Sequence, residues 1–159
     1  MAREINGSLD GSGLRIGVVV ARFNAYITER LLAGARRALA EVGVSDDDVT
    51  IVRVPGAFEV PLAARELAAG GGIDAVVCLA AVIRGETPHF DFVAQAAADG
   101  VRSTMLEVGV PMAFGVLTTN TVEQAVERSN EGQGNKGAEA VATAIEMVRV
   151  QRAIRRGAY

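Results

Sequence analysis

The chain has 159 residues and a formal net charge of −3 at pH 7; 50% of its residues are hydrophobic and only 4% aromatic. This length predicts one domain over residues 1–159 with its own core, and the charge gives no support to a nucleic-acid partner, which needs a basic face. The apolar runs are too short to span a bilayer and the first residues lack an apolar signal core, so we expect a cytoplasmic protein without a membrane partner.

The first quarter of the chain predicts an arm, a strand and a helix. Residues 1–10 form a short polar arm that we expect to pair with the sheet edge of a neighbouring subunit. Leu14–Ala21 is a continuous apolar run, typical of a strand buried on both faces. A helix follows with apolar residues at i, i+4 spacing, and Gly43 ends it.

Two further strands are predicted before the middle of the chain. Asp46–Asp48 indicates a solvated turn, and Val49–Val54 indicates the second strand. A helix opens at Pro61 and runs to about Ala69, and the apolar run Ala75–Ile83 is the third strand. Cys78 is the only cysteine, so no internal disulfide is possible; inside this run we expect an inert, buried thiol.

The second half continues the alternation of strands and helices. An apolar stripe from Val93 to Met105 predicts a helix, and Met112–Leu117 predicts a fourth strand. Thr121 and Gln124 have the spacing of a capping box for a short helix, and the last helix follows Gly134–Gly137. Strands that alternate with helices favour right-handed crossovers. The predicted fold is therefore α/β, a three-layer α/β/α sandwich of flavodoxin-like type on a four-stranded parallel sheet.

One stretch, Ala80–Asp91, joins the end of the third strand to a helix start. We expect Thr87 to cap that helix and Pro88 to take its first position. The backbone N–H groups from Gly85 to His89, with the positive end of the helix dipole behind them, predict an anion site. His89 is the only histidine of the chain, so a single titratable imidazole would lie beside the bound anion.

Several common catalytic motifs are absent. The sequence has no P-loop and no G-x-S-x-G. Gly11 and Gly13 precede a strand, so they do not form a dinucleotide fingerprint. One histidine and one cysteine cannot make a structural zinc site. The chemistry must therefore use few side chains, or the substrates must react largely by themselves.

The loops expected at the carboxyl ends of the strands resemble those of one enzyme family. The resemblance is to 6,7-dimethyl-8-ribityllumazine synthase, the penultimate enzyme of riboflavin synthesis, and it covers nearly the whole chain. Several segments occur in the family's order, which makes the match specific. They are Gly17–Asn24, Val54–Pro61, Val82–Asp91, Gly115–Asn120, Glu127-Arg128 and Gly134–Gly137.

The resemblance implies a condensation without metal or cofactor. The amine of a ribitylamino-uracil attacks the ketone of 3,4-dihydroxy-2-butanone 4-phosphate, a Schiff base forms, phosphate leaves, and the ring closes with loss of water. The imine joins the two substrates, so no enzyme lysine is needed as a nucleophile. A chain with a single lysine, Lys136, fits this chemistry.

The family's site residues map onto matching positions of this sequence. His89 would carry protons. A second set would bind the pyrimidine and the ribityl chain: Phe23, Ala57, Phe58, Glu59, Ala81, Val82, Ile83 and Phe114. Phosphate would be bound by Glu86, Thr87 and Arg128. Asn24, Lys136 and Glu139 are further candidate residues of the site, the last two through its electrostatics.

Most of these residues also have a simpler structural interpretation. Ala81, Val82, Ile83 and Phe114 are ordinary buried strand residues by pattern alone, and Phe23 could be a core aromatic. Glu59 and Arg128 suit the ends of a helix dipole. Two alternatives to the enzyme therefore stay open: a flavin- or nucleotide-binding module without turnover, and a shell protein that has lost catalysis.

The resemblance also implies a homo-oligomer. Five subunits would share their sites, with Phe23 and His89 from one chain and Phe114 and Arg128 from the next. Some relatives assemble twelve pentamers into a 60-subunit shell, and the short link from Arg128 to Lys136 favours the shell here. The shell suggests a protein partner, a riboflavin synthase enclosed within it. Two departures from the family pattern stand out: Ala80-Ala81, where a glycine is common, and Ser129-Asn130, where Ala-Gly is common.

Overall fold

The computed structural model describes residues 1–157 and contains one four-stranded sheet. All neighbouring strands are parallel, in the order β2-β1-β3-β4, which confirms the flavodoxin-like prediction. The strands are β1 (Ile16–Ala21), β2 (Val49–Val54), β3 (Ala75–Ile83) and β4 (Met112–Thr119).

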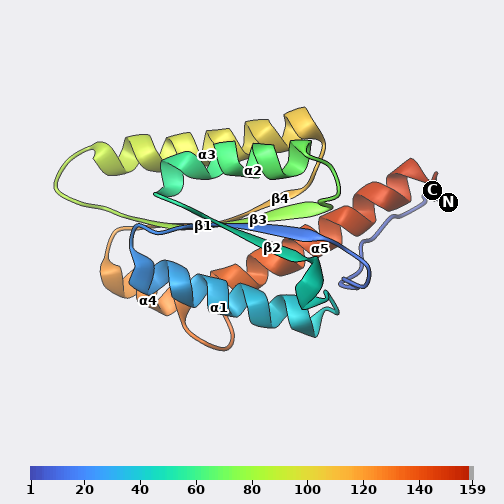
Figure 1. Ribbon diagram of the computed structural model, residues 1–159, viewed down its shortest axis with the longest axis horizontal. Coiled ribbons are helices and arrows are strands. Elements are labelled where there is room, and N and C mark those ends of the chain that lie inside the picture. Colours follow the sequence, from blue (N-terminus) through green and yellow to red (C-terminus); the bar gives the residue numbers. More distant parts are fainter. Residues whose placement is uncertain (158–159) are drawn as a thin grey trace.

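Five α-helices cover the two faces of this sheet (Figure 1). On one face lie α2 (Val60–Ala69) and α3 (His89–Val108). On the other lie α1 (Ala25–Glu41), α4 (Val122–Ser129) and α5 (Lys136–Arg155). The arrangement is the predicted three-layer sandwich, because each parallel crossover places a helix on a face of the sheet.

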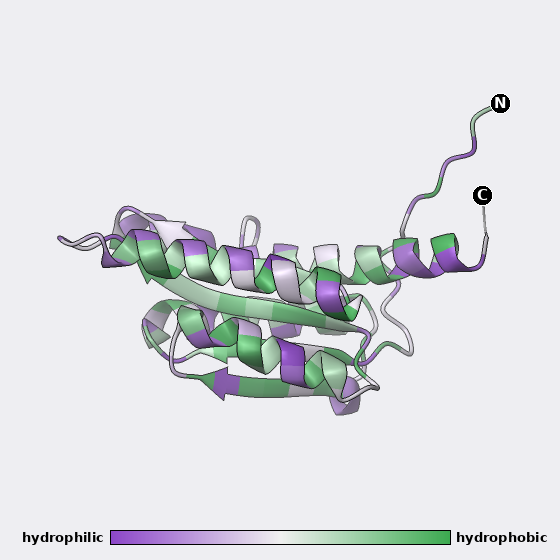
Figure 2. Cartoon of the chain, turned by 90° about the horizontal axis from the view of Figure 1, so that it is seen from above, coloured by the Kyte–Doolittle hydropathy of each residue, from purple (hydrophilic) through white to green (hydrophobic). Residues whose placement is uncertain are grey.

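The two faces of the sheet bury two separate clusters of apolar side chains. Alternate residues of β1 point to opposite faces: Val18 packs with α1 and α5, and Val19 packs with α2 and α3. The two central strands are consequently buried almost throughout, and the strand visible between the helices in Figure 2 is mostly in the hydrophobic colour. Strands buried on both faces read as the continuous apolar runs seen in the sequence.

Two strand boundaries differ from the prediction. The first strand begins at Ile16 rather than Leu14, although Leu14 is buried in the core. The fourth strand continues past Leu117 to Thr119, because Val82 and Ile83 of β3 pair with Thr118 and Thr119. The two threonines, expected in a loop, therefore belong to the sheet.

Short polar segments also differ in detail. Asp46–Asp48 forms one turn of 3-10 helix, and Ala57–Glu59 forms another before α2. The Thr121 hydroxyl accepts from the Gln124 N–H as a capping box requires, but the Gln124 side chain accepts from the N–H of Asn120 instead of Thr121. The box is thus half confirmed, and its second bond holds Asn120, the residue that follows β4.

The N-terminal arm forms no strand among the described residues. Gly7 lies against α5 so closely that a β-carbon would meet the carbonyl of Glu146. Arg149 of α5 donates to the carbonyls of Asp10 and Ser12, at 2.8 and 3.0 Å. The arm and the end of α5 project together from one end of the molecule (Figures 1 and 2); pairing with a neighbour's sheet stays a prediction. Within residues 1–157, no helix is both long and apolar enough to span a membrane.

Candidate functional site

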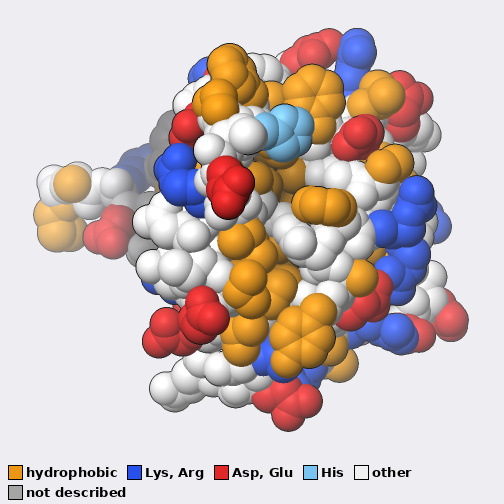
Figure 3. Space-filling model, turned by 90° about the vertical axis from the view of Figure 1, so that its left-hand side faces the viewer, with side chains coloured by type: hydrophobic (Ala, Val, Ile, Leu, Met, Phe, Trp, Pro, Cys, Tyr) orange, Lys and Arg blue, Asp and Glu red, His pale blue; other side chains and the backbone are white. Residues whose placement is uncertain are grey.

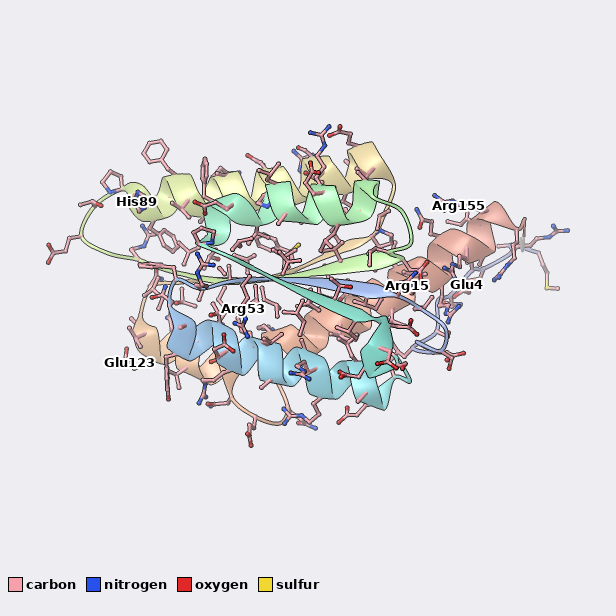
Figure 4. All side chains as sticks on the ribbon, viewed as in Figure 1. Glu4, Arg15, Arg53, His89, Glu123 and Arg155 are labelled. Carbon is pink, nitrogen blue, oxygen red and sulfur yellow. The ribbon has the colours of Figure 1, made fainter. Side chains whose placement is uncertain are left out.

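The carboxyl ends of the four strands meet at the end of the molecule opposite the termini. His89 starts α3 at this end, whereas Glu4, Arg15 and Arg155 lie at the other (Figure 4). In open parallel sheets ligands bind at the carboxyl ends of the strands. Figure 3 looks onto this end and shows the single histidine at the surface among exposed hydrophobic side chains.

A first hollow of about 720 Å³ lies at the ends of β1, β2 and β3. It brings together most residues predicted to bind the pyrimidine and ribityl groups, and places the imidazole beside them. Its lining includes Phe23, Ala57, Phe58, Glu59, Ala81, Val82, Ile83, Thr87 and His89. The wall is thus apolar and aromatic with a few polar groups, as is usual for small-molecule sites.

Phe23 is 71% exposed, so it is not a core aromatic. Its loop is held by backbone bonds to the neighbouring strand: the N–H of Arg22 donates to Val54 at 2.8 Å, and that of Phe23 to Pro55 at 3.0 Å. Asn24, with φ of 60°, then turns the chain into α1. The backbone of Phe23 is therefore held in place while its aromatic ring is exposed, an arrangement that suits stacking on a ligand.

The start of α3 differs from the prediction in one respect. Pro88, expected at the first helical position, is the N-cap residue, and no side chain caps the helix. The Thr87 side chain therefore makes no capping bond, and the Pro88 carbonyl accepts from the N–H of Asp91 at 3.0 Å. Thr87 faces the first hollow instead. Glu86 is exposed and is not part of that lining.

A second hollow of about 440 Å³ lies at the edge strand β4. It brings together the other predicted residues, Phe114 on β4, Arg128 on α4, and Lys136 and Glu139 on α5. Phe114 is 44% exposed, unlike the fully buried strand residue that its pattern allows. Apart from Asn24 and Glu86, which line neither, the predicted site residues are thus divided between two hollows, and no described residue lines both.

The two cations of the second hollow are held by short-range contacts. Arg128 donates to the carbonyl of Gln124 at 3.1 Å and lies 3.8 Å from the carboxylate of Glu127. Lys136 donates to the carboxylate of Glu139 at 2.8 Å. These pairs are partly exposed, so they orient the side chains while leaving charge available to a ligand.

The departure Ser129-Asn130 has a partner in α1. Arg30 donates to the Ser129 hydroxyl at 3.2 Å and also to the side chain of Asn130. The Ser129 hydroxyl in turn donates to Ala125 at 2.9 Å. An Ala-Gly pair has no side-chain acceptors, so here the two residues fasten the end of α4 to α1.

Asn135 is a residue whose structural importance the sequence prediction missed. Its side chain, 2% exposed, accepts from the N–H groups of Gly137 and Ala138 and donates to the carbonyls of Ser129 and Asn130. It therefore caps α5 and fixes the link that precedes it. An asparagine directly before a helical pattern is the signal that could have indicated the cap.

Cys78 is buried at the middle of the sheet, and burial raises the pKa of its thiol to about 12. The expected inert thiol is thus confirmed, because the thiolate is the reactive form. Among residues 1–157, no group of three or more His, Cys, Asp or Glu side chains is arranged to hold a metal ion.

A model of the 6,7-dimethyl-8-ribityllumazine synthase family matches residues 13–152. The chain belongs to this family. The match spans both hollows, from Phe23 to Glu139, and confirms the resemblance found in the sequence. Lumazine synthases are enzymes of riboflavin biosynthesis, and the α/β fold described above is consistent with theirs.

Proposed function

We propose that the protein condenses 5-amino-6-(D-ribitylamino)uracil with 3,4-dihydroxy-2-butanone 4-phosphate to 6,7-dimethyl-8-ribityllumazine, with release of phosphate and water. The observation that carries the proposal is the first hollow, in which most residues expected to bind the uracil substrate lie together with His89. The family membership of the chain supports it. The amine of the uracil forms a Schiff base with the ketone, so the step needs no metal, cofactor or enzyme nucleophile. Residues 1–159 would form one such domain with residues 1–10 as its arm.

The uracil substrate would occupy the first hollow. Phe23, exposed at the end of β1, would stack on the pyrimidine ring. Ala81, Val82 and Ile83 would line the edge of the ring from the end of β3. The 3-10 turn Ala57–Glu59 would hold the ribityl chain through its backbone and the Glu59 carboxylate.

His89 would carry protons between the reacting atoms. It opens α3 and lines the same hollow as Phe23, so it can reach an imine formed there. The N–H groups at this helix start, with Glu86 and Thr87 before them, would receive the phosphate of the ketone substrate. An imidazole beside a leaving phosphate can donate the proton that the departing groups require.

The second hollow would complete the site of a neighbouring subunit. Phe114 on the edge strand β4 and Arg128 on α4 line it, away from the first hollow of the same chain. A head-to-tail ring would bring this edge against the first hollow of the next chain. Phe114 would then close the pyrimidine pocket and Arg128 would bind the phosphate with its planar fork; Asn24, Lys136 and Glu139 would contribute less directly.

The proposed assembly is a pentamer, further assembled into a 60-subunit shell that could enclose a riboflavin synthase. The argument for the shell is the short link between α4 and α5, in which Gly132 and Gly134 take positive φ of 89° and 85°. Light scattering on the native protein tests it: a particle of five chains would argue against the shell. The cytoplasmic location stays a prediction.

The activity test mixes the two substrates with the protein and follows lumazine absorbance. Turnover above the uncatalysed background is expected. A protein that binds riboflavin-like ligands but does not accelerate the reaction would instead be a binding module, and one that does neither would be a shell protein. The Phe23→Ser variant is the control, since it removes the stacking ring and leaves the phosphate-binding groups in place.

A further inference from the structure

Arg84 bridges two elements that carry different parts of the proposed site. It follows β3 directly, and its backbone N–H donates to the carbonyl of Thr119 at the end of β4, at 2.9 Å. Its guanidinium Nε donates to the Asn120 side chain at 2.9 Å. The same guanidinium donates to the Asp91 carboxylate in the first turn of α3 at 3.3 Å. One side chain therefore joins the end of β4 to the start of α3.

The contact with α3 has a second component. The centre of the guanidinium lies 4.3 Å from the centroid of the Phe90 ring, within the range of a cation–π contact. Phe90 is nearly buried, so this ring is fixed by the core and gives the guanidinium a firm surface. A planar guanidinium can stack and donate two directed hydrogen bonds at once, which an ammonium cannot do.

The start of α3 lacks the usual means of fixing a helix end. No side chain caps the helix, and the N-cap residue is a proline. His89 precedes Phe90 and Asp91, both of which Arg84 contacts. The contacts of the Arg84 guanidinium with Phe90 and Asp91, together with the burial of Phe90, therefore hold the first turn next to His89.

We propose that Arg84 is a positioning residue: it holds His89 and the phosphate loop Gly85–Pro88 in their working geometry through Phe90, Asp91 and Asn120. The expected effect of Arg84 on turnover rests on the proposed function. Asn120 also lies between the end of β4 and α4, the helix that carries Arg128. Arg84 therefore ties the placement of the imidazole to the element that places the phosphate-binding arginine.

The test uses the chemistry of the single histidine. Diethylpyrocarbonate acylates an accessible imidazole, and peptide mass identifies the His89 adduct in a particle of any size. We would measure the rate of His89 acylation with and without inorganic phosphate in the wild type, Arg84→Ala and Arg84→Lys. The matched control is Arg65→Ala, because Arg65 also ties α3 to a neighbouring element, through Glu107 at 3.0 Å near the far end of the helix.

We expect phosphate to protect His89 in the wild type and in Arg65→Ala. In Arg84→Ala and Arg84→Lys, the phosphate concentration that gives half protection of His89 should rise at least about 10-fold. The value of kcat/KM should fall about 10–100-fold, because a displacement of catalytic groups near 1 Å has effects of this size. Lysine should fail to rescue because it lacks the fork. Wild-type behaviour in Arg84→Ala would overturn the inference. Full rescue by lysine would also overturn it, and would make Arg84 a direct ligand of phosphate.

Two further outcomes separate this inference from the proposed function. If the wild-type protein neither catalyses the reaction nor is protected by phosphate, the proposed function fails. The inference about Arg84 is then decided by the rates of His89 acylation without phosphate: equal rates in Arg84→Ala and in the wild type would reject the positioning role. If Arg84→Ala does not fold, Asn120→Ala removes one partner and keeps the arginine. A smaller shift in the same direction is then expected, and no shift would overturn the inference.

Discussion

The side-chain amide of Asn24 donates a hydrogen bond of 2.8 Å to the backbone carbonyl of Ala81, 57 positions along the chain. This bond joins the loop after β1, which presents Phe23, to the end of β3, which lines the same hollow. Asn24 also has a left-handed backbone, with φ of 60°, a conformation that asparagine tolerates better than most residues. One side chain thus sets both the turn and the distance between two walls of the site.

Two substitutions separate these roles of Asn24. Asn24→Gly removes the amide but accepts positive φ, whereas Asn24→Ala removes the amide and adds backbone strain of about 1–2 kcal/mol. Both variants should bind the uracil substrate more weakly, and only the alanine variant should be clearly less stable. Thermal midpoints and KM for the uracil check this. Equal loss of stability in the two variants would show that the hydrogen bond, and not the backbone, matters for folding.

His89→Ala should slow turnover and leave residual activity, because imine chemistry proceeds slowly with water as the proton carrier. General acid–base help is typically ~10²–10⁴-fold, and we expect the low end. The measurement is kcat from lumazine absorbance, with the thermal midpoint as a control for folding. A folded variant with no activity at all, or with unchanged kcat, would contradict a proton-carrying role.

The fold was predictable because its signals are local. The four strands appear as apolar runs, since a parallel sheet covered on both faces needs no alternation. The boundaries were less predictable where tertiary pairing decides them: Thr118 and Thr119 were expected in a loop although threonine is common in strands, and β3 extends far enough to pair with them. The start of α3 was predicted one residue early for a related reason, because the Thr87 side chain faces the hollow instead of the helix.

The site was predictable only in part. Family resemblance indicated Phe23, His89 and Arg128 residue by residue, but no local pattern places them in two hollows. The residues that support the site were harder to find. Arg84 donates to Asn120, 36 positions away, and such a partner is invisible until the strands and helices are packed. The bonds by which Asn135 caps α5 are local, and its place before a helical pattern was the signal that was missed.

Thr28 offers a test of stability away from the chemistry. Among residues 1–157, its hydroxyl is a buried side-chain oxygen without a hydrogen-bond partner. A buried, unpaired polar group costs about 1–3 kcal/mol, so Thr28→Val should raise the thermal midpoint. The control is Thr119→Val, because the buried Thr119 hydroxyl donates to Thr121 at 2.9 Å and its loss should lower the midpoint. A fall in both variants would mean that a water molecule satisfies Thr28.

Arg128→Ser should raise KM for the phosphorylated ketone far more than KM for the uracil. The substitution removes the side-chain charge of the second hollow and leaves the N–H groups at the start of α3 intact. Arg30→Ala is a useful comparison: it removes a cation that fastens α4 through Ser129 but does not line either hollow. Equal rises of the two KM values in Arg128→Ser would mean that Arg128 maintains the shape of the site instead of binding phosphate.

The division of the site between two hollows predicts complementation between variants that are each impaired in one hollow. Phe23→Ser damages the first hollow and Arg128→Ser the second. Suppose that neighbouring chains share each site and that a ring is assembled from equal amounts of both variants. A site is then intact where an Arg128→Ser chain contributes its undamaged first hollow and the neighbouring Phe23→Ser chain contributes its undamaged second hollow. In a closed head-to-tail ring with random mixing, this is about a quarter of the sites.

Co-expression of the two variants, followed by purification through a tag on one of them, provides the mixed rings. Their activity per site should approach a quarter of the wild-type value and exceed the average of the two separate variants. Mixing the variants after each has assembled is the control, and should give no gain if the rings do not exchange subunits. Activity equal to the average in co-expressed rings would show that each chain completes its own site, and Phe114 and Arg128 would then have to be removed from the proposed pocket.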